Sequence, residues 1–513
     1  MLSITGIPLA MATQHPDSAS RSFSAREEVE EAVMDILPIH RGGFGLDEKM
    51  IDYEGKLTPY HQVSWVVEAL IKEGLQPGED FLITPRIPSE RLEEAERQIM
   101  VLWGVIVANK KAVEAYGEPA VRYIITPMCS RGYEVFVLQR RIMKMQKLAE
   151  EEIGAKTGTI EVIPLVEDIT SLIHVEKVVE GMRAALLSNL GVHYDHYRVL
   201  LGKSDTALGH GHLASSLALA IALAKLSSLS ESWGTPIYPI IGVGALPFRG
   251  HLSPSGVDLF IKQYAGYATA TIQSGLRFDM GHEAVQKVVS VLRAGLGGRP
   301  PHGLLSEFPS LVKALRIATA EYLRIVSPVS GKVLALAGLV PRRRDRVSHN
   351  SYGRSLLSSL RFTADHGLIS SLVNIVKKVR FPRAIRYSAA LYSAGLPPSI
   401  VGLGRAFARI EEELGPDFLE ELISLLPLLR LDFIVDTSYF VPSAVKRFFG
   451  EKFLSLVRDD MLAAAAYLGS EPSEPTEEYS LAVMSIVDAV AAGDAISASE
   501  AVIRAGLLRG SLG

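Results

Sequence analysis

The chain has a single cysteine, Cys129, among its 513 residues. One thiol excludes a disulfide within the chain and a cysteine-based zinc site. Cys129 follows an apolar run, and we expect it to be a small, half-buried residue. The N-terminal segment also lacks the basic region that begins a signal peptide. We therefore expect a cytoplasmic protein.

Long apolar runs are absent as well. The most apolar helical segment, 213–226, is shorter than the ~20 residues that a bilayer needs, and Lys225 interrupts it. We expect a soluble protein with no membrane partner. The formal net charge of −4 disfavours a nucleic-acid partner, because binding to phosphates requires an excess of basic residues. There is no P-loop, and Gly242-Val-Gly-Ala lacks the third glycine of a dinucleotide-binding motif.

The apolar residues of the chain are arranged in short runs. Hydrophobic residues make up 48% of it, enough for a large buried core. Between residues 80 and 300, short β-branched runs alternate with helical patterns. The expected strands are 81–84, 121–126, 159–166, 197–201, 239–243 and 268–272, and the expected helices are 91–116, 133–151, 175–187, one from 212 and one from 282. Repeated strand-then-helix units imply parallel strands with right-handed crossovers.

Charged residues follow these strands closely. Arg86, Glu167, Asp205, Arg249 and Arg277 each come just after an expected strand. In an open sheet they would spread along an edge, whereas in a barrel they would converge on one mouth, where barrel active sites lie. We therefore favour an α/β fold with a (β/α)8 TIM-type barrel.

The remainder of the chain has a helical pattern. Segments 305–326, 369–378, 398–413 and 476–490 show apolar residues at i, i+3 and i+4. No low-complexity linker separates the two halves. We expect residues 1–304 to form the barrel with the catalytic motifs, and residues 305–513 to form a mainly helical part integrated with it.

Glu167 and Asp205 are one strand–helix–strand step apart. Adjacent barrel strands would bring both carboxylates to the same rim, and magnesium commonly takes one or two carboxylates plus substrate oxygens and waters. Asp168 is an alternative ligand beside Glu167. Each acidic residue could instead cap a helix or pair with an arginine.

Three arginines and one histidine complete the candidate site. Arg86, Arg249 and Arg277 suit bidentate binding of phosphate or carboxylate, although an ion-paired arginine is the ordinary alternative. His15 precedes Pro16, which restricts its backbone to extended conformations. A histidine held in this way can act as an acid or base near neutral pH, or it can be an ordinary loop residue.

Two further motifs carry weaker signals. His210-Gly-His212 stands at an expected helix start, where free N–H groups attract anions; no third ligand supports a zinc site. The basic cluster from Arg342 to Arg346 reads as a solvated, salt-bridged surface, with contact to a phosphate, an effector or a subunit as the alternative.

Several of these segments together resemble archaeal-type phosphoenolpyruvate carboxylase. They are Met11-Ala-Thr-Gln-His-Pro-Asp17, Leu201-Gly-Lys-Ser-Asp-Thr-Ala-Leu208, Pro239-Ile-Ile-Gly-Val-Gly-Ala-Leu-Pro-Phe-Arg-Gly-His-Leu-Ser-Pro254 and the segment Arg509-Gly-Ser-Leu-Gly513. The motifs occur in the family's order and extend over essentially the whole chain.

The resemblance implies a barrel with extra helices, bound Mg²⁺ or Mn²⁺, and the reaction of phosphoenolpyruvate with bicarbonate to give oxaloacetate and phosphate. It also implies an allosteric enzyme that forms a homodimer or homotetramer. His15 matches the family's His-Pro histidine, Glu167 and Asp205 its metal carboxylates, and Arg249 its essential arginine. Arg86 and Arg277 match substrate arginines, and Gly513 matches its terminal glycine.

The chain departs from the longer members of the superfamily at two places. Leu208 stands where they carry a lysine, and the loop at Arg249 has one arginine instead of two. The residues that contact bicarbonate are therefore unassigned. Two other functions remain open: a magnesium-dependent barrel lyase or aldolase acting on a 2-oxo acid, and a metabolite-binding or RNA-associated scaffold without enzymatic activity.

Overall fold

The computed structural model describes residues 6–301, 303–345 and 354–513. Eight parallel strands form a closed barrel in chain order, with β1 pairing with β8. The strands are β1 Ala10–Ala12, β2 Glu48–Asp52, β3 Leu82–Arg86, β4 Tyr123–Thr126, β5 Glu161–Val166, β6 Tyr197–Gly202, β7 Ile237–Gly242 and β8 Thr269–Ile272. The predicted barrel is confirmed.

Helices surround the strands as right-handed crossovers require. They are α1 Glu27–Ile36, η1 Ile39–Arg41, α2 Gln62–Lys72, α3 Ala95–Tyr116, α4 Gly132–Ile153, α5 Ile169–Leu172, α6 Val175–Leu190, α7 Lys203–His210, α8 His212–Trp233, η2 Pro247–Arg249, α9 Val257–Gln263, the π-helical turn η3 Gly275–Asp279 and α10 His282–Ala294. Inside the barrel, apolar side chains from seven strands form a core that includes Met50, Ile125 and Leu200.

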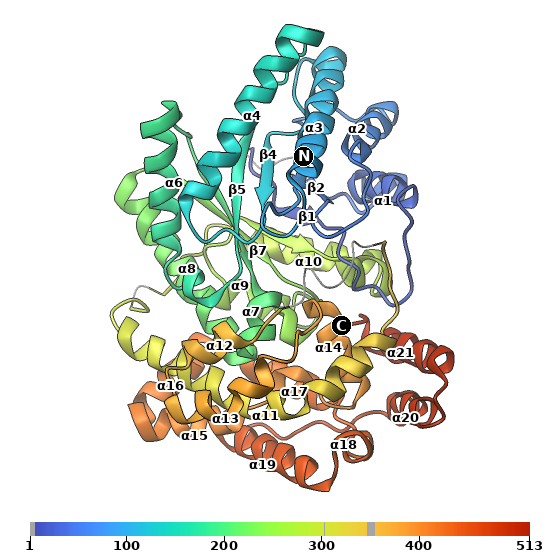
Figure 1. Ribbon diagram of the computed structural model, residues 1–513, viewed down its shortest axis with the longest axis vertical. Coiled ribbons are helices and arrows are strands. Elements are labelled where there is room, and N and C mark those ends of the chain that lie inside the picture. The colour runs from blue at the N-terminus through green and yellow to red at the C-terminus, as the bar shows by residue number, and fades with distance from the viewer. Residues whose placement is uncertain (1–5, 302, 346–353) are drawn as a thin grey trace.

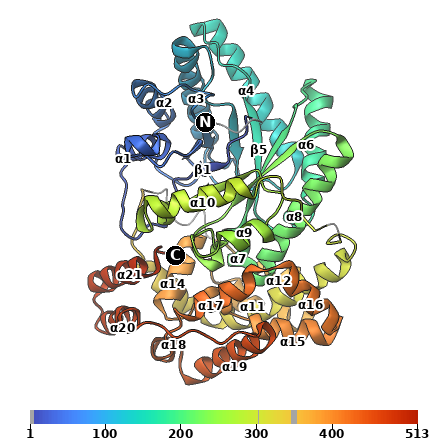
Figure 2. The same cartoon turned by 180° about the vertical axis from the view of Figure 1, so that it is seen from behind.

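The rest of the chain is helical. Its elements are α11 Phe308–Leu339, α12 Leu357–Phe362, α13 His366–Val376, α14 Ala384–Ser393, η4 Pro398–Ile400, α15 Leu403–Leu414, α16 Pro416–Leu425, α17 Leu428–Thr437, α18 Pro442–Phe449, α19 Glu451–Leu468, α20 Glu477–Ala491 and α21 Ala495–Arg509. Figures 1 and 2 show these helices as a layer against one end of the barrel. Helix α14 packs on α7, and α17 packs on η2 and α9, so the layer covers the carboxyl ends of the strands. The division at residue 304 stays a prediction.

Strands β1 and β2 are not predicted by the sequence pattern. Strand β1 has three residues, and β2 carries Glu48, Lys49 and Asp52, all of them buried. Those charges are compensated by distant partners; for example, both oxygens of Glu48 accept hydrogen bonds from Arg198 of β6 at 2.8 Å. No local pattern reveals such pairing.

The helix that contains the apolar segment 213–226 is α8, and it is longer than we expected from the sequence. It has 22 residues, and by length and composition both α8 and α11 could cross a bilayer. However, 78% of the most apolar window of α8 is buried inside the protein. Its apolar surface packs against α6, α7 and α11, so it is a core helix of this fold.

Candidate active site at the barrel mouth

A cavity of about 630 Å³ lies between the barrel mouth and the helical layer. The barrel contributes His15, Arg86, Glu167, Ser204, Asp205, Arg249 and Gln273 to its wall, and the helical part contributes Arg342, Lys378, Arg380, Arg383 and Leu512. The volume suits a small ligand. The many basic side chains make it a site for an anion.

Glu167 and Asp205 meet at this cavity, as predicted from their strand positions. Glu167 follows β5, and Asp205 lies in the first turn of α7, directly after β6. Their carboxyl groups lie close enough to affect each other's pKa, and Arg354 contacts both of them, at 3.3 Å from Asp205. Burial raises the pKa of Glu167 to about 7, and Asp205 adds to the rise. Burial opposes ionisation of Asp205 too, but Arg354 and Arg383 lower its pKa to about 2.

This pair fits a divalent cation. Asp205 Oδ1 is buried without a hydrogen-bond partner, and two adjacent carboxylates are a donor set for Mg²⁺ or Mn²⁺. Asp168 does not join them, because it caps α5 by accepting a hydrogen bond from Ser171 N at 3.0 Å. Within the described residues, no group of three or more His, Cys, Asp or Glu side chains could hold a metal. The remaining ligands would be substrate oxygens and water.

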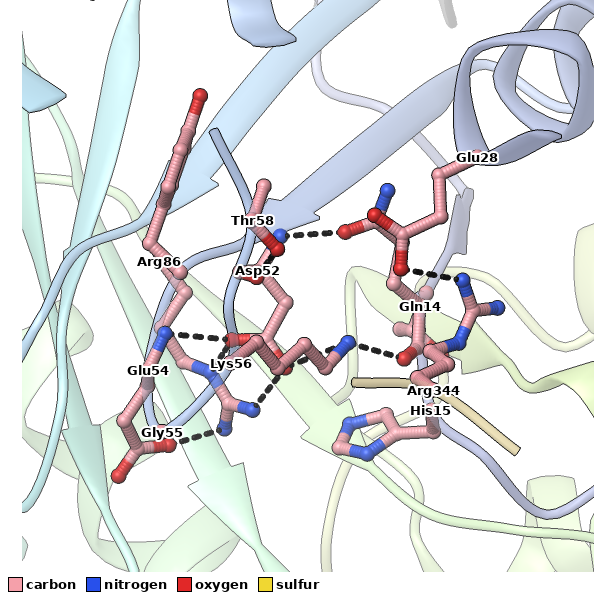
Figure 3. Close-up of polar contacts among 12 residues, drawn as sticks. Gln14, His15, Glu28, Asp52, Glu54, Gly55, Lys56, Thr58, Arg86 and Arg344 are labelled. Atoms are coloured by element: carbon pink, nitrogen blue, oxygen red, sulfur yellow. Dashed lines mark hydrogen bonds and ion pairs between the residues drawn. The ribbon is translucent and has the colours of Figure 1, made fainter. Parts of the chain in front are cut away.

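Arg86, the last residue of β3, is held rigidly in the cavity wall. It forms a bidentate pair with Asp52 at 2.8 and 2.6 Å, and its third nitrogen lies 3.1 Å from Glu54. Glu54 also pairs with Arg383 of the helical part at 3.0 Å. Figure 3 shows Arg86 between the two carboxylates, with Lys56 linking Asp52 to the Gln14 carbonyl. The sharing of Glu54 brings two guanidinium groups to one side of the cavity.

His15 follows β1 and lines the cavity beside this cluster. Burial, reinforced by the charge of Arg86, holds its pKa well below the ordinary value for histidine. The imidazole is therefore neutral near pH 7. A neutral ring can accept a proton from a bound substrate, which is the role expected from the sequence.

Arg249 lies in η2, directly after β7, and is fully buried. Its guanidinium donates hydrogen bonds to Ser204 Oγ at 3.1 Å, to the Gly513 carbonyl at 2.9 Å and to Gln273. The structure thus brings together the predicted residues Arg249 and Gly513. There is no room for a methyl group on Gly513, because a Cβ would lie 2.5 Å from the Ile385 carbonyl.

Arg277 lies elsewhere. It is buried in η3, pairs with Glu31 at 3.0 Å and with Asp35, and is not part of the cavity wall. Glu31 also pairs with Arg344 at 2.7 Å. The expectation of a solvated surface is therefore wrong for Arg344, which is 3% exposed, and Arg346 lies outside the described residues.

Cys129 and the His210-Gly-His212 motif are buried in the protein interior. Cys129 is buried, and burial raises its thiol pKa to about 12. His210 contacts Thr319 and Ser359, whereas His212 bonds to Asp432, so the two histidines share no ligand. Sequence reasoning missed Arg354 and Arg383, since both come from helical-part segments without strand ends to mark them.

Comparisons with known proteins agree with this geometry. A family model described as phosphoenolpyruvate carboxylase matches residues 7–513. A protein named phosphoenolpyruvate carboxylase from Methanosarcina mazei is 35% identical to this chain, over 88% of this chain and 87% of its own length. A protein of the same name from Pyrobaculum islandicum is 34% identical, over 88% of this chain and 91% of its own length. A protein of the same name from Methanopyrus kandleri is 36% identical, over 83% of this chain and 82% of its own length. The resemblance in the motifs is confirmed, and the chain belongs to the archaeal-type phosphoenolpyruvate carboxylase family.

Proposed function

We propose that this protein carboxylates phosphoenolpyruvate with bicarbonate, giving oxaloacetate and phosphate. The observation that carries the proposal is the cavity itself. It combines an adjacent carboxylate pair, Glu167 and Asp205, with buried or half-buried arginines on both sides and a neutral histidine. The substrate is a phosphorylated acid, so it needs cationic contacts at two ends.

Glu167 and Asp205 would hold Mg²⁺ or Mn²⁺. When bound, the cation would supply positive charge to the enol oxygen of the substrate, where negative charge develops. Asp205 Oδ1 has no partner within the described residues, so it is available as a ligand. Arg354 would have to share or give up its contacts with the two carboxylates.

The arginines would bind and orient phosphoenolpyruvate. Arg86 and Arg383 contact Glu54 from different parts of the chain, and both line the cavity, where a planar guanidinium group suits the oxygens of an anion. Arg249, held by Ser204 and Gln273, would stabilise charge on the transferring phosphoryl group. The sequence-based expectation that Arg277 contacts substrate is untested. Because Arg277 does not line the cavity and Arg383 does, we propose that Arg383 takes that place.

Bicarbonate oxygen would attack phosphorus, and the bond from phosphorus to the enol oxygen would break. The products of this step are carboxyphosphate and the enolate of pyruvate. His15, in its neutral form, would accept the carboxyl proton of carboxyphosphate, which then collapses to carbon dioxide and phosphate. The enolate carbon attacks carbon dioxide. The helical layer over the mouth would exclude water, because protonation of the enolate would give pyruvate instead.

We further propose a cytoplasmic enzyme that forms a homodimer or homotetramer and is under allosteric control. The oligomeric state and the allosteric control rest on the family alone, and the location rests on the sequence pattern of the N-terminal segment. The bicarbonate contacts lie in the same cavity, since bicarbonate must reach the phosphoryl group.

Oxaloacetate formation by the purified protein tests the function. A coupled assay with phosphoenolpyruvate should show turnover that requires both bicarbonate and a divalent cation, and that stops on addition of a chelator. The lyase alternative predicts cleavage or aldol addition of a 2-oxo acid with no requirement for bicarbonate. A binding scaffold would show neither activity.

A further inference from the structure

A second buried cluster lies behind the Arg249 loop, outside the cavity. It consists of Lys203 of α7, His212 at the start of α8, His251 in the loop and Asp432 of α17, each at most 2% exposed. None of the four lines the cavity. The mechanism above uses none of them.

The side chains form a continuous chain of contacts. His251 Nδ1 lies 2.5 Å from Asp432 Oδ1, and His212 Nε2 lies 2.8 Å from Asp432 Oδ2. The other nitrogen of His212 is 3.4 Å from Lys203 Nζ, which donates to Ser215 Oγ at 2.9 Å. One carboxylate of the helical layer therefore contacts both the loop that carries Arg249 and the helices that follow β6.

The loop backbone at this point is unusual. His251 has a φ of 58°, a left-handed conformation that costs free energy in a residue with a side chain. The preceding Gly250 has no room for a side chain, because a Cβ would lie 2.5 Å from Val243. Such a backbone persists only where its surroundings hold it. The His251 ring contacts Asp432 through Nδ1 at 2.5 Å and Ser255 Oγ through Nε2 at 3.3 Å, and the contact with Asp432 is the shorter of the two.

We propose that Asp432 is a positioning residue, which fixes the Arg249 loop relative to the start of α8 so that Arg249 and Asp205 keep their places in the cavity wall. Lys203 lies two residues before Asp205 on α7, and its side chain passes within 3.3 Å of the place where a Gly250 Cβ would lie. The cluster thus connects the loop that carries Arg249 to α7, the helix that carries Asp205. This inference rests on the proposed role of Arg249.

The chain supplies a matched control on the same helix. Asp436, one turn after Asp432, is also fully buried and accepts hydrogen bonds from Tyr392 at 2.7 Å and from Ser399. Neither of its partners lines the cavity. Asp432→Asn and Asp436→Asn remove the same charge from the same helix, and both should lower the thermal unfolding midpoint.

Steady-state kinetics separate the two variants. Asp432→Asn should lower kcat/KM for phosphoenolpyruvate about tenfold or more, mainly through kcat, because small displacements of a catalytic group are costly. Asp436→Asn should keep wild-type kinetics. In an Arg249→Lys background, Asp432→Asn should add less than about a twofold loss, since the two residues act as one unit.

Equal kinetics in the two variants, or an undiminished effect in the Arg249→Lys background, would overturn the inference. If Asp432→Asn does not fold, His251→Asn replaces it, because asparagine tolerates positive φ but cannot reach Asp432; wild-type kinetics in that variant would also overturn it. Wild-type kinetics of Arg249→Lys alone would instead contradict the proposed role of Arg249.

Discussion

Two of the buried ionic clusters in this protein are built from similar residue types but differ in what they do. The first, here called the closed cluster, joins Glu28, Glu31 and Asp35 of α1 to Lys49, Arg277 and Arg344. The second, the open cluster, comprises Glu167, Asp205, Arg354 and the nearby Arg249. Only the open cluster lines the cavity.

The difference lies in how the charges are compensated. The closed cluster has three acidic and three basic side chains, and each is paired with a partner of opposite charge at full burial. In the open cluster, the buried atom without a partner is a carboxylate oxygen, that of Asp205, and burial raises the pKa of Glu167. In the closed cluster, the atoms without a partner are the Nε atoms of Arg277 and Arg344, whose guanidinium groups are already paired with carboxylates. Compensated charges hold elements together, whereas uncompensated ones leave room for a cation or a substrate.

The largest expected effect is that of Asp205→Asn in the open cluster. Removing one metal ligand should lower oxaloacetate formation about a thousandfold or more, because metal stabilisation is worth several kcal/mol. High Mn²⁺ should restore part of the activity, and the thermal midpoint should change little. Asp35→Asn in the closed cluster should instead lower the free energy of unfolding by about 3–5 kcal/mol and leave the activity of the folded enzyme nearly unchanged. Wild-type turnover of Asp205→Asn at low Mg²⁺ would rule out the ligand assignment.

His15→Asn should separate the two half-reactions. If His15 acts after phosphoryl transfer, the variant should lose oxaloacetate formation about 10²–10⁴-fold yet still release phosphate when bicarbonate is present. Phosphate and oxaloacetate are measured in the same reaction. Loss of both products would place His15 in substrate binding or in the first step, and full activity would remove it from the site.

Deleting Leu512 and Gly513 should have a smaller effect. The deletion removes the carbonyl that accepts a hydrogen bond from Arg249, a charge-assisted contact worth about 1.5–3 kcal/mol. Turnover should fall while the circular dichroism spectrum is retained. Gly513→Ala is the companion variant, since its methyl group would collide with Ile385 and Ala389. An active deletion variant would show that this segment only completes α21.

The sequence reveals the open cluster better than the closed one. Glu167, Asp205 and Arg249 could be predicted because each follows a strand, and a parallel barrel gathers such positions at one mouth. Arg277 satisfies the same rule, yet its charge is taken up by Glu31 and Asp35, which belong to α1. Arg383 lines the cavity and Arg354 contacts Glu167 and Asp205; both come from the helical part, and only tertiary packing places them there.

The most direct test compares two arginines, one from each cluster. Arg249→Lys keeps the charge but loses the planar fork, and it should cost about 2–4 kcal/mol of transition-state stabilisation. Its stability should fall as well, because Gln273 and Gly513 lose a buried donor, so the kinetic loss is what distinguishes it. Arg277→Lys should lower stability by about 1–3 kcal/mol, because buried acceptors lose their donors, and leave kcat/KM nearly unchanged. The values of kcat/KM and the thermal unfolding midpoints of both variants show whether Arg249 acts in the reaction and Arg277 in stability alone. A kinetic loss in Arg277→Lys as large as that in Arg249→Lys would contradict the distinction between the two clusters.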